Sequence, residues 1–425
     1  MLDIKFIREN AEVVKTAVLN KNEKTDIKKL ISLDNRKRTL QFEYDRYRND
    51  QRVLSQKIPK FKAIGKDVTD LLDDLKERAM IVKKTLDKLN QVSLELEKEL
   101  LTVPNIPHVS VPIGKDESAN TFVREWGEKK EFDFAPKDHF ELVQQNDLLD
   151  FKRAAKLSGH GFAFYTDKGA LLERALINFM LDFHIKKHGY KEISAPFIVN
   201  RSTMTGTGQL PKLEEDMYLI EQDDLFLIPT AEVSVTNIFA DEIVHHKILP
   251  QKFVSYSPCF RREAGSYGKD TKGLQRLHQF NKVEMVRFVK PGNSYIAFEK
   301  MLVDAEEILQ ELGLHYRIMT ISSGDLSFAS TKTYDIEVWA PGAKKYLEVS
   351  SVSNFEDFQA RRASIRFRDE NGKVKFVHTL NGSGLATPRT YIALIENYQN
   401  MDGSFSLPVC LKPYIQDIWQ EVLFV

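Results

Sequence analysis

The sequence predicts an α+β protein in which a long antiparallel coiled-coil hairpin precedes an antiparallel β-sheet flanked by helices. Residues 1 to about 103 have few of the glycines and prolines that punctuate the rest of the chain, and they carry two heptad seams. Beyond 120, short β-rich runs are separated by Gly/Pro turns in no regular βαβ order. Because 103–120 contains three prolines and is typical of a linker, we expect two domains, 1–103 and 104–425.

The predicted hairpin has two arms of different charge. Its seams cover 30–58 and 72–103, and arms of about 32 residues would extend roughly 48 Å. Residues 24–66 hold 13 Lys/Arg against 5 Asp/Glu, whereas 67–100 hold 6 against 9. Two interpretations stay open: a solvated or dimerising coiled coil, or an arm whose positive charge follows a phosphate backbone.

The stretch "IPKFKAIGKDVTD" separates the two seams and predicts the turn at the tip. Pro59 and Gly65 are expected to break the first helix. Thr69 or Asp70 is expected to cap the second one.

Composition excludes several classes of protein. The 61 Lys/Arg balance 61 Asp/Glu, so a nucleic acid or membrane partner would need a local patch of charge. Cys259 and Cys410 lack the spacing of a cysteine zinc site and suggest a reducing compartment. The first residues are charged from Asp3 onward, and no run approaches the roughly 20 apolar residues of a membrane span. We therefore expect a cytoplasmic protein that does not contact a membrane.

The stretch "SPCFRREAGSYGKDTKGLQRLHQFNKVEMVRF" (257–288) concentrates chemistry in one predicted β-hairpin. Alternation along its second strand places four side chains on one face, namely His278, Phe280, Lys282 and Glu284. An aromatic ring can stack a purine, arginines bind phosphate oxygens, and a carboxylate holds an ammonium group. A surface hairpin with ordinary salt bridges is the alternative. The connecting loop is glycine-rich and basic, with Gly265, Gly268, Lys269, Lys272 and Gly273.

Three motifs in this order resemble those of class II aminoacyl-tRNA synthetases. "FRREAGSYGKDTKGLQRLHQFNKVE" is similar to the second motif in the form seen in bacterial-type seryl-tRNA synthetases. "GYKEISAPF" looks like the first motif, in which Pro196 would lie at a dimer interface. "NGSGLATPRTYIALIENYQ" looks like the third and carries Arg389. The resemblance extends over essentially the whole chain and implies a class II catalytic domain after the hairpin.

The resemblance implies an ATP site. Arg261 would hold the α-phosphate and Arg389 would close over the nucleotide, as the two catalytic residues. The oxygens of Glu348 and Ser351 would hold Mg²⁺. The implied ATP-binding set is Arg261, Arg262, Glu263, Arg276, Phe280, Glu348, Val349, Ser350, Ser351 and Arg389.

It also implies a serine site, and a site that hydrogen-bonds the serine hydroxyl would reject alanine. Thr230 has a second interpretation, as the cap of the helix that follows Pro229. A capping box would place an acid at Val233, so capping does not explain Glu232. The implied serine-binding set is Thr230, Ala231, Glu232, Arg261, Glu284, Asn381 and Ser383.

The implied reaction is activation of L-serine by ATP to seryl-adenylate, followed by transfer to tRNA(Ser) and also tRNA(Sec). The hairpin would grip the tRNA by shape and backbone, and the enzyme would be a homodimer. Three alternatives remain: an adenylating relative that charges a carrier protein, a coiled-coil interaction protein with an inactive core, and another class II synthetase.

Two features depart from the family pattern. Pro388 directly precedes Arg389, where proline suits a first helical turn. The apolar tail 415–425 is expected to pack on the catalytic domain or on a dimer partner.

Overall fold

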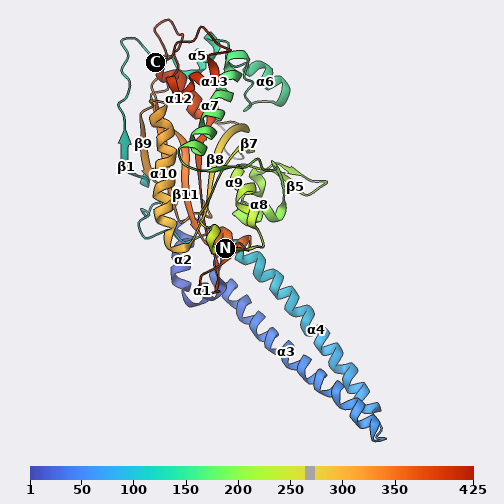
Figure 1. Ribbon diagram of the computed structural model, residues 1–425. Helices are drawn as coiled ribbons and strands as arrows, with labels where there is room; N and C mark the ends of the chain where they lie inside the picture. Colours follow the sequence, from blue (N-terminus) through green and yellow to red (C-terminus); the bar gives the residue numbers. More distant parts are fainter. Residues whose placement is uncertain (264–272) are drawn as a thin grey trace. The chain divides into compact units, whose positions relative to one another are not determined.

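The computed structural model describes residues 1–263 and 273–425 (Figure 1). The predicted loop positions Gly265, Gly268, Lys269 and Lys272 lie outside the described residues. The chain forms two compact units. One consists of 2–19 and 23–104, and the other of Met1, 20–22 and 105–425.

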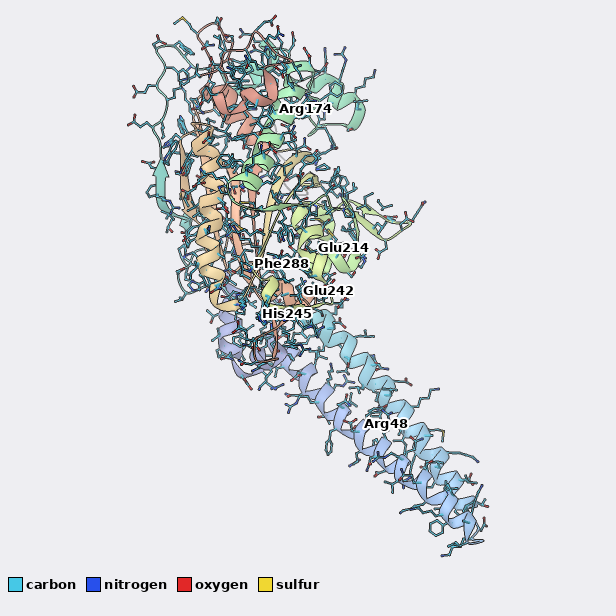
Figure 2. The ribbon with its side chains drawn as sticks, in the orientation of Figure 1. Arg48, Arg174, Glu214, Glu242, His245 and Phe288 are labelled. Atoms are coloured by element: carbon cyan, nitrogen blue, oxygen red, sulfur yellow. The ribbon has the colours of Figure 1, made fainter. Side chains whose placement is uncertain are left out.

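The smaller unit contains the predicted hairpin. Its helices are α1 (Ile4–Glu9), α2 (Ala11–Asn20), α3 (Ile27–Ala63) and α4 (Thr69–Leu100). α3 and α4 lie side by side along their length, and Figure 2 shows Arg48 among the side chains that project from the pair. The buried seam residues are Leu30, Leu33, Leu54, Ile58, Leu89, Leu96, Leu100 and Val103. The antiparallel helix pair is thus confirmed.

The tip differs from the prediction in two details. Pro59 lies inside α3, which continues to Ala63, so it does not end the helix. It costs one backbone hydrogen bond only one turn before the end, where the helix tolerates the loss. The cap prediction for α4 was also wrong, because Val68 occupies the N-cap position and the Asp67 carboxylate accepts the Thr69 amide at 3.0 Å.

The larger unit is built on an eight-stranded sheet, which confirms the predicted α+β class. Its neighbours are antiparallel except the edge pair β2 and β7, which is parallel. The strand order is β1 (Thr121–Trp126), β9 (Tyr316–Thr320), β10 (Lys332–Ala340), β11 (Lys345–Glu356), β14 (His378–Ala386), β8 (Gln279–Val289), β7 (Gln251–Phe260) and β2 (Lys191–Glu192).

Three long helices pack on this sheet: α7 (Asp167–Lys186), α10 (Ser294–Glu311) and α12 (Thr387–Asn397). They share one apolar core with the central strands. A second core lies on β7 and β8 and includes Phe288, labelled in Figure 2. Pro388 occupies the first turn of α12, as its sequence position predicts. Among the described residues, no helix combines the length and apolarity that a bilayer crossing requires.

Smaller elements complete the unit. Two three-stranded sheets have the orders β13–β12–β6 and β3–β5–β4. The elements are α5 (His139–Gln145), α6 (Phe151–Ser158), β3 (Ile198–Asn200), α8 (Arg201–Thr207), β4 (Leu219–Ile220), β5 (Leu225–Leu227), α9 (Ala231–Thr236), β6 (Ile243–His245), α11 (Phe358–Arg362), β12 (Arg366–Arg368), β13 (Val374–Phe376) and α13 (Lys412–Ile415).

The apolar tail packs on its own unit. Trp419 meets Phe405 edge-on with ring centroids 5.8 Å apart, and the Lys168 ammonium lies 5.0 Å from the Trp419 ring. Leu407 forms a bridge with Phe424. The tail therefore packs on the catalytic domain, which is the first of the two sites predicted for it.

Lys21 is a buried cation within the larger unit. Its ammonium donates to the carbonyl oxygens of Ser327, Phe328 and Ser330 at 2.8, 3.2 and 2.6 Å. The segment 327–330 is otherwise irregular, and this single donor holds three of its carbonyls together.

Candidate functional site

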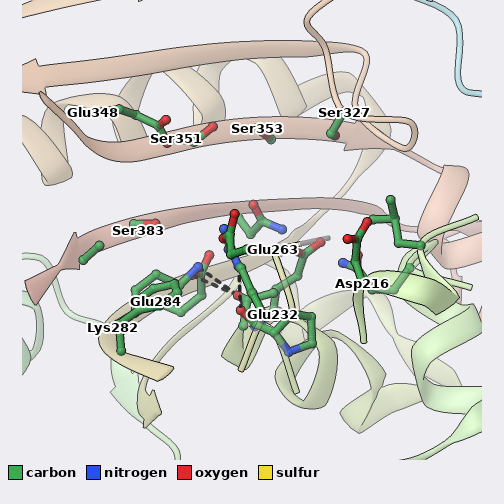
Figure 3. Close-up of a pocket in the computed structure, with 18 of the residues that line it drawn as sticks. Asp216, Glu232, Glu263, Lys282, Glu284, Ser327, Glu348, Ser351, Ser353 and Ser383 are labelled. Atoms are coloured by element: carbon green, nitrogen blue, oxygen red, sulfur yellow. Dashed lines mark hydrogen bonds and ion pairs between the residues drawn. The ribbon is translucent and has the colours of Figure 1, made fainter. Parts of the chain in front are cut away.

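A cavity of about 630 Å³ opens over β8, β11 and β14 of the large sheet (Figure 3). It brings together most of the residues predicted to bind ATP and serine. The predicted residues that line it are Thr230, Glu232, Arg261, Glu263, Arg276, Phe280, Glu284, Glu348, Val349, Ser351, Asn381, Ser383 and Arg389.

The pairing of β7 with β8 sets up one wall. Arg261 follows β7, and its guanidinium carbon lies 5.2 Å from the centre of the Phe280 ring on β8. Its Nε donates to the Pro229 carbonyl oxygen at 3.3 Å. Arg276 donates to Glu263 at 2.9 Å. This wall therefore presents an aromatic face, a guanidinium fixed above it, and a second guanidinium that already holds a carboxylate.

Further lining residues come from β11 and the start of α12. Arg389 donates to the backbone oxygen of Glu348 at 2.8 Å and to its carboxylate at 3.4 Å. Its Nε also donates to the Gln275 carbonyl oxygen at 3.2 Å. Because three acceptor atoms fix the guanidinium, Arg389 lines the cavity in a defined orientation.

A compact charged cluster lines one part of the cavity (Figure 3). Lys282 and Glu284, two residues apart on β8, form a buried ion pair. The Lys282 ammonium donates to Thr230 Oγ1 at 2.9 Å, and that hydroxyl donates to Glu284 at 3.2 Å. Thr230 is also the N-cap of α9, since it accepts the Glu232 amide at 3.2 Å. The capping and binding interpretations of Thr230 are therefore compatible.

Glu232 brings a second carboxylate to this part of the cavity. Burial, followed by the charge of Glu284, raises the pKa of Glu232 to about 7. Gln359 donates to its Oε1 at 2.6 Å, and this bond favours the ionised form. Two carboxylates beside one lysine leave a net negative pocket at high pH, which suits a ligand ammonium group.

Three predicted site residues do not line the cavity. Ala231 is buried in the second core. Ser350 is buried and donates to the Ser383 carbonyl oxygen at 2.6 Å, which ties β11 to β14. Arg262 points elsewhere and donates to the Glu215 carbonyl oxygen at 3.0 Å.

Two residues that shape the site were given no role from the sequence. Alternation placed Lys282 on the same strand face as Phe280 and Glu284, but it was not included in either binding set. Gln359 is in α11, and no local pattern connects it with Glu232.

The oxygens of Glu348 and Ser351 face the cavity from one strand, with Asp335 behind them on β10. Asp335 Oδ1 is buried and has no hydrogen-bond partner among the described residues. Burial and then the charge of Glu348 raise the pKa of Asp335 well above its ordinary value. Within 1–263 and 273–425, no group of three His, Cys, Asp or Glu side chains could hold a metal ion on its own.

Comparison with known proteins gives consistent matches over the whole chain. Residues 1–107 match the model of the seryl-tRNA synthetase N-terminal domain, and 216–398 match the class II tRNA synthetase core domain for G, H, P, S and T. The chain is 54% identical over 415 residues to a serine–tRNA ligase of Caldicellulosiruptor bescii, covering 98% of this chain and 99% of that protein. It is 52% identical over 417 residues to the enzyme of Thermoanaerobacter pseudethanolicus, with coverage of 98% and 99%.

Solved structures agree with these matches. The ATP complex of seryl-tRNA synthetase from Pyrococcus horikoshii superposes with a TM-score of 0.91 at 38% identity, covering 97% of this chain and 98% of that one. The cytoplasmic serine–tRNA ligase of Naegleria fowleri with AMP gives 0.85 at 28% identity, with 97% of each chain covered.

Proposed function

The chain belongs to the seryl-tRNA synthetase family and is a serine–tRNA ligase that uses ATP, and from this premise we propose how its residues divide the reaction. The observation that carries the proposal is the shared strand face of β8. Phe280 and Glu284 line one cavity from that face, with Arg261 above the aromatic ring. An aromatic surface, a guanidinium and a carboxylate in this order match the base, the α-phosphate and the amino group of a seryl-adenylate.

The nucleotide is proposed to lie between the arginines that line the cavity. Phe280 would stack against adenine, Glu263 would accept from its amino group, and Arg276 would contact the γ-phosphate. Arg389 would cover the nucleotide from the opposite side. The remaining direct ATP contacts of this proposal come from Val349 and Ser351, which line the cavity.

Serine is proposed to bind at the charged cluster. Glu232 and Glu284 would hold its ammonium group, and the polar side chains of Thr230, Asn381 and Ser383 surround the position of its hydroxyl. A substrate without the hydroxyl would leave buried polar groups unpaired, which supports selection for serine.

The activation step needs no side-chain nucleophile. The serine carboxylate attacks the α-phosphorus, the bond to the β-phosphate oxygen breaks, and pyrophosphate leaves. Arg261 would stabilise the charge that develops on the α-phosphate oxygens, and Arg389 would fix the nucleotide for in-line attack. In the second step the 3′-hydroxyl of the terminal adenosine attacks the seryl carbonyl, and AMP leaves.

The residues fit Mg²⁺, which the proposed reaction uses with ATP. Glu348 and Ser351 supply hard oxygen ligands, and Mg²⁺ commonly binds through one or two protein oxygens together with substrate phosphates. Asp335 lies on the neighbouring strand, and its Oδ1 is buried with no hydrogen-bond partner among the described residues. When bound, the ion supplies charge neutralisation at the phosphates.

The unit assignments are part of the same proposal. Residues 1–103 would act as the arm that grips tRNA(Ser), with the basic side of 24–66 against the RNA backbone, and 104–425 as the catalytic domain. Because recognition by shape extends to related tRNAs, we include tRNA(Sec) as a substrate. The site of action would be the cytoplasm, in keeping with the free thiols of Cys259 and Cys410.

The deciding experiment is amino-acid-dependent exchange of pyrophosphate into ATP, measured with all twenty amino acids. We expect exchange with serine. Exchange with threonine or proline and none with serine would overturn the proposal. Serylation of tRNA(Ser) and tRNA(Sec) transcripts, with a tRNA that lacks a long variable arm as control, tests the RNA substrates.

A further inference from the structure

A buried polar cluster lies directly behind the cavity, and the proposed reaction does not use it. Glu173 of α7 is 5% exposed and lines no part of the cavity. Its Oε1 accepts from Asn281 Nδ2 at 2.9 Å and is hydrogen-bonded to the Thr387 hydroxyl. The Thr387 hydroxyl also lies 3.0 Å from the Asn281 backbone oxygen. One carboxyl group therefore joins α7, β8 and α12.

The two partners of Glu173 stand next to the proposed nucleotide-binding residues. Asn281 lies between Phe280 and Lys282 on β8, both of which line the cavity. Thr387 is the first residue of α12 and lies two positions before Arg389. No side chain caps this helix, so the Thr387 hydroxyl is the polar contact that ties its first residue to β8.

The number of hydrogens in the cluster limits how its hydrogen bonds can be arranged. The Thr387 hydroxyl has one hydrogen but two acceptors within reach, Glu173 Oε1 and the Asn281 backbone oxygen. When Glu173 carries a proton on Oε1, it donates to Thr387, and Thr387 donates to Asn281. Every hydrogen then has an acceptor.

Burial supports this neutral form. It raises the pKa of Glu173 to about 7. The other oxygen, Oε2, is buried and has no hydrogen-bond partner among the described residues, and the same holds for the hydroxyls of Tyr165 and Tyr391. A charge beside such an apolar and unpaired environment is costly.

We propose that Glu173 is a positioning residue for the nucleotide site, which fixes the spacing between Phe280 on β8 and Arg389 on α12 through Asn281 and Thr387. This inference rests on the proposed ATP site. Among the described residues, Thr230 and Glu284 form no hydrogen bond with the cluster, and the cluster joins the two elements that carry Phe280 and Arg389, so the larger effect is expected on the nucleotide.

The test measures serine-dependent pyrophosphate exchange and separates the KM for ATP from the KM for serine. Glu173→Ala is expected to raise the KM for ATP about tenfold, the size of one or two lost buried hydrogen bonds. The KM for serine should change less than about twofold. Glu173→Gln keeps the shape and one of the two hydrogen bonds, so it should restore the KM for ATP to within about threefold of wild type.

Variants at the partner residue make the test independent of the folding of one mutant. Thr387→Val removes the hydroxyl at constant shape and should match Glu173→Ala, while Thr387→Ser should behave as wild type. Their double mutant should be no worse than either single one, because both remove the same network. Tyr165→Phe is the matched control in the same buried cluster, since its hydroxyl has no described partner.

Equal increases in both KM values, or an unchanged KM for ATP in Glu173→Ala or Thr387→Val, would overturn the inference. Failure of Glu173→Gln to improve on Glu173→Ala would do so as well. A wild-type protein that shows no serine-dependent exchange would instead refute the proposed function, so the two failures are distinguishable.

Discussion

Arg261 and Phe280 form the residue pair on which the proposed activation step depends most directly. The guanidinium lies across the ring and is held by the Pro229 carbonyl, so its position does not depend on a bound ligand. Such a preorganised cation costs little reorganisation when charge develops on a phosphate. A flexible lysine ammonium at this position would provide the charge without the fixed, planar donor pair.

Replacement of this arginine should therefore affect the chemical step. We expect Arg261→Ala to lower kcat/KM for serine-dependent exchange by about 10²- to 10³-fold, and Arg261→Lys to recover only part of the loss. Arg368→Ala, on the small sheet away from the cavity, is the matched control and should retain wild-type exchange. A loss below about threefold in Arg261→Ala would contradict the assigned role.

Glu232 makes a prediction about pH. Its carboxyl has a pKa of about 7, so it is mostly neutral at pH 6 and mostly ionised at pH 8. The serine ammonium is attracted only by the ionised form. The KM for serine should therefore fall roughly tenfold as the pH rises from 6 to 8, and this slope should vanish in Glu232→Gln. A slope that persists in the variant would assign the titration to another group.

The raised pKa of Glu232 also affects the stability of the fold, which should decrease as the pH rises, whereas serine binding should improve. Because the folded pKa of Glu232 lies above its ordinary value, the folded state binds the proton more tightly than the unfolded state. Glu232 thus favours folding at low pH and loses this contribution as the pH rises toward 7. Chemical denaturation of wild type and Glu232→Gln at pH 5 and pH 8 checks the sign.

At the scale of elements, the sequence predicted what depends on periodicity. The heptad seams of α3 and α4 follow from spacings of three and four residues, and the side-chain face of β8 follows from a spacing of two. Details that depend on competition between neighbouring groups were missed. The Asp67 carboxylate, rather than Thr69 or Asp70, takes the first amide of α4, and Pro59 is tolerated one turn from a helix end.

Contacts between segments far apart in the sequence could not be predicted either. The bond from Gln359 to Glu232 joins residues 127 positions apart, and the bond from Thr387 to Glu173 joins residues 214 apart. Neither has a local spacing that a single sequence can show. The motif resemblance predicted many of the residues that line the cavity. The side chains that hold them in place could be identified only from the three-dimensional structure.

The helix pair leads to a prediction of its own. Replacing 30–100 by a short Gly/Ser linker should leave serine-dependent exchange within about threefold of wild type, because no residue of that segment lines the cavity. Charging of tRNA(Ser) should fall by at least about 100-fold with the loss of phosphate contacts.

A milder variant checks that charge is the cause. Reversal of Lys57, Lys60 and Lys62 to Glu at the tip should keep the helices folded, by circular dichroism, and still weaken tRNA binding with a reduced salt dependence. If the deletion abolished exchange and charging equally, the pair would be required for the fold of the catalytic unit instead.

At the scale of the whole molecule, the segment just beyond the last strand of the sheet carries the predicted dimer proline. β2 contributes only Lys191 and Glu192, and beyond it Pro196 is exposed while Ile198 is 45% exposed. A two-residue charged strand protects a sheet edge from further pairing, so the support comes instead from Pro196, which is exposed in the motif whose resemblance implies a dimer contact, and from the exposed Ile198 directly after that motif. We therefore propose this region as the homodimer interface.

Light scattering after gel filtration should give about twice the chain mass of 49.0 kDa. Ile198→Asp should shift the population toward the monomer by placing a charge in the interface. Ile243→Asp, at a similarly exposed aliphatic residue on the small sheet, is the control and should remain dimeric. A wild-type monomer at micromolar concentration would refute the proposal.

Lys21 has a practical consequence for dividing the protein. Its ammonium is the shared donor for carbonyls on 327–330, and Ser327 and Phe328 line the cavity. The catalytic body is therefore not a contiguous stretch of the gene. Expression of residues 104–425 alone would leave three carbonyl groups at the edge of the cavity without this donor, whereas excision of 30–100 from the full chain keeps it. A minimal serine-activating enzyme should therefore keep Lys21 together with 105–425, while it can lose 30–100.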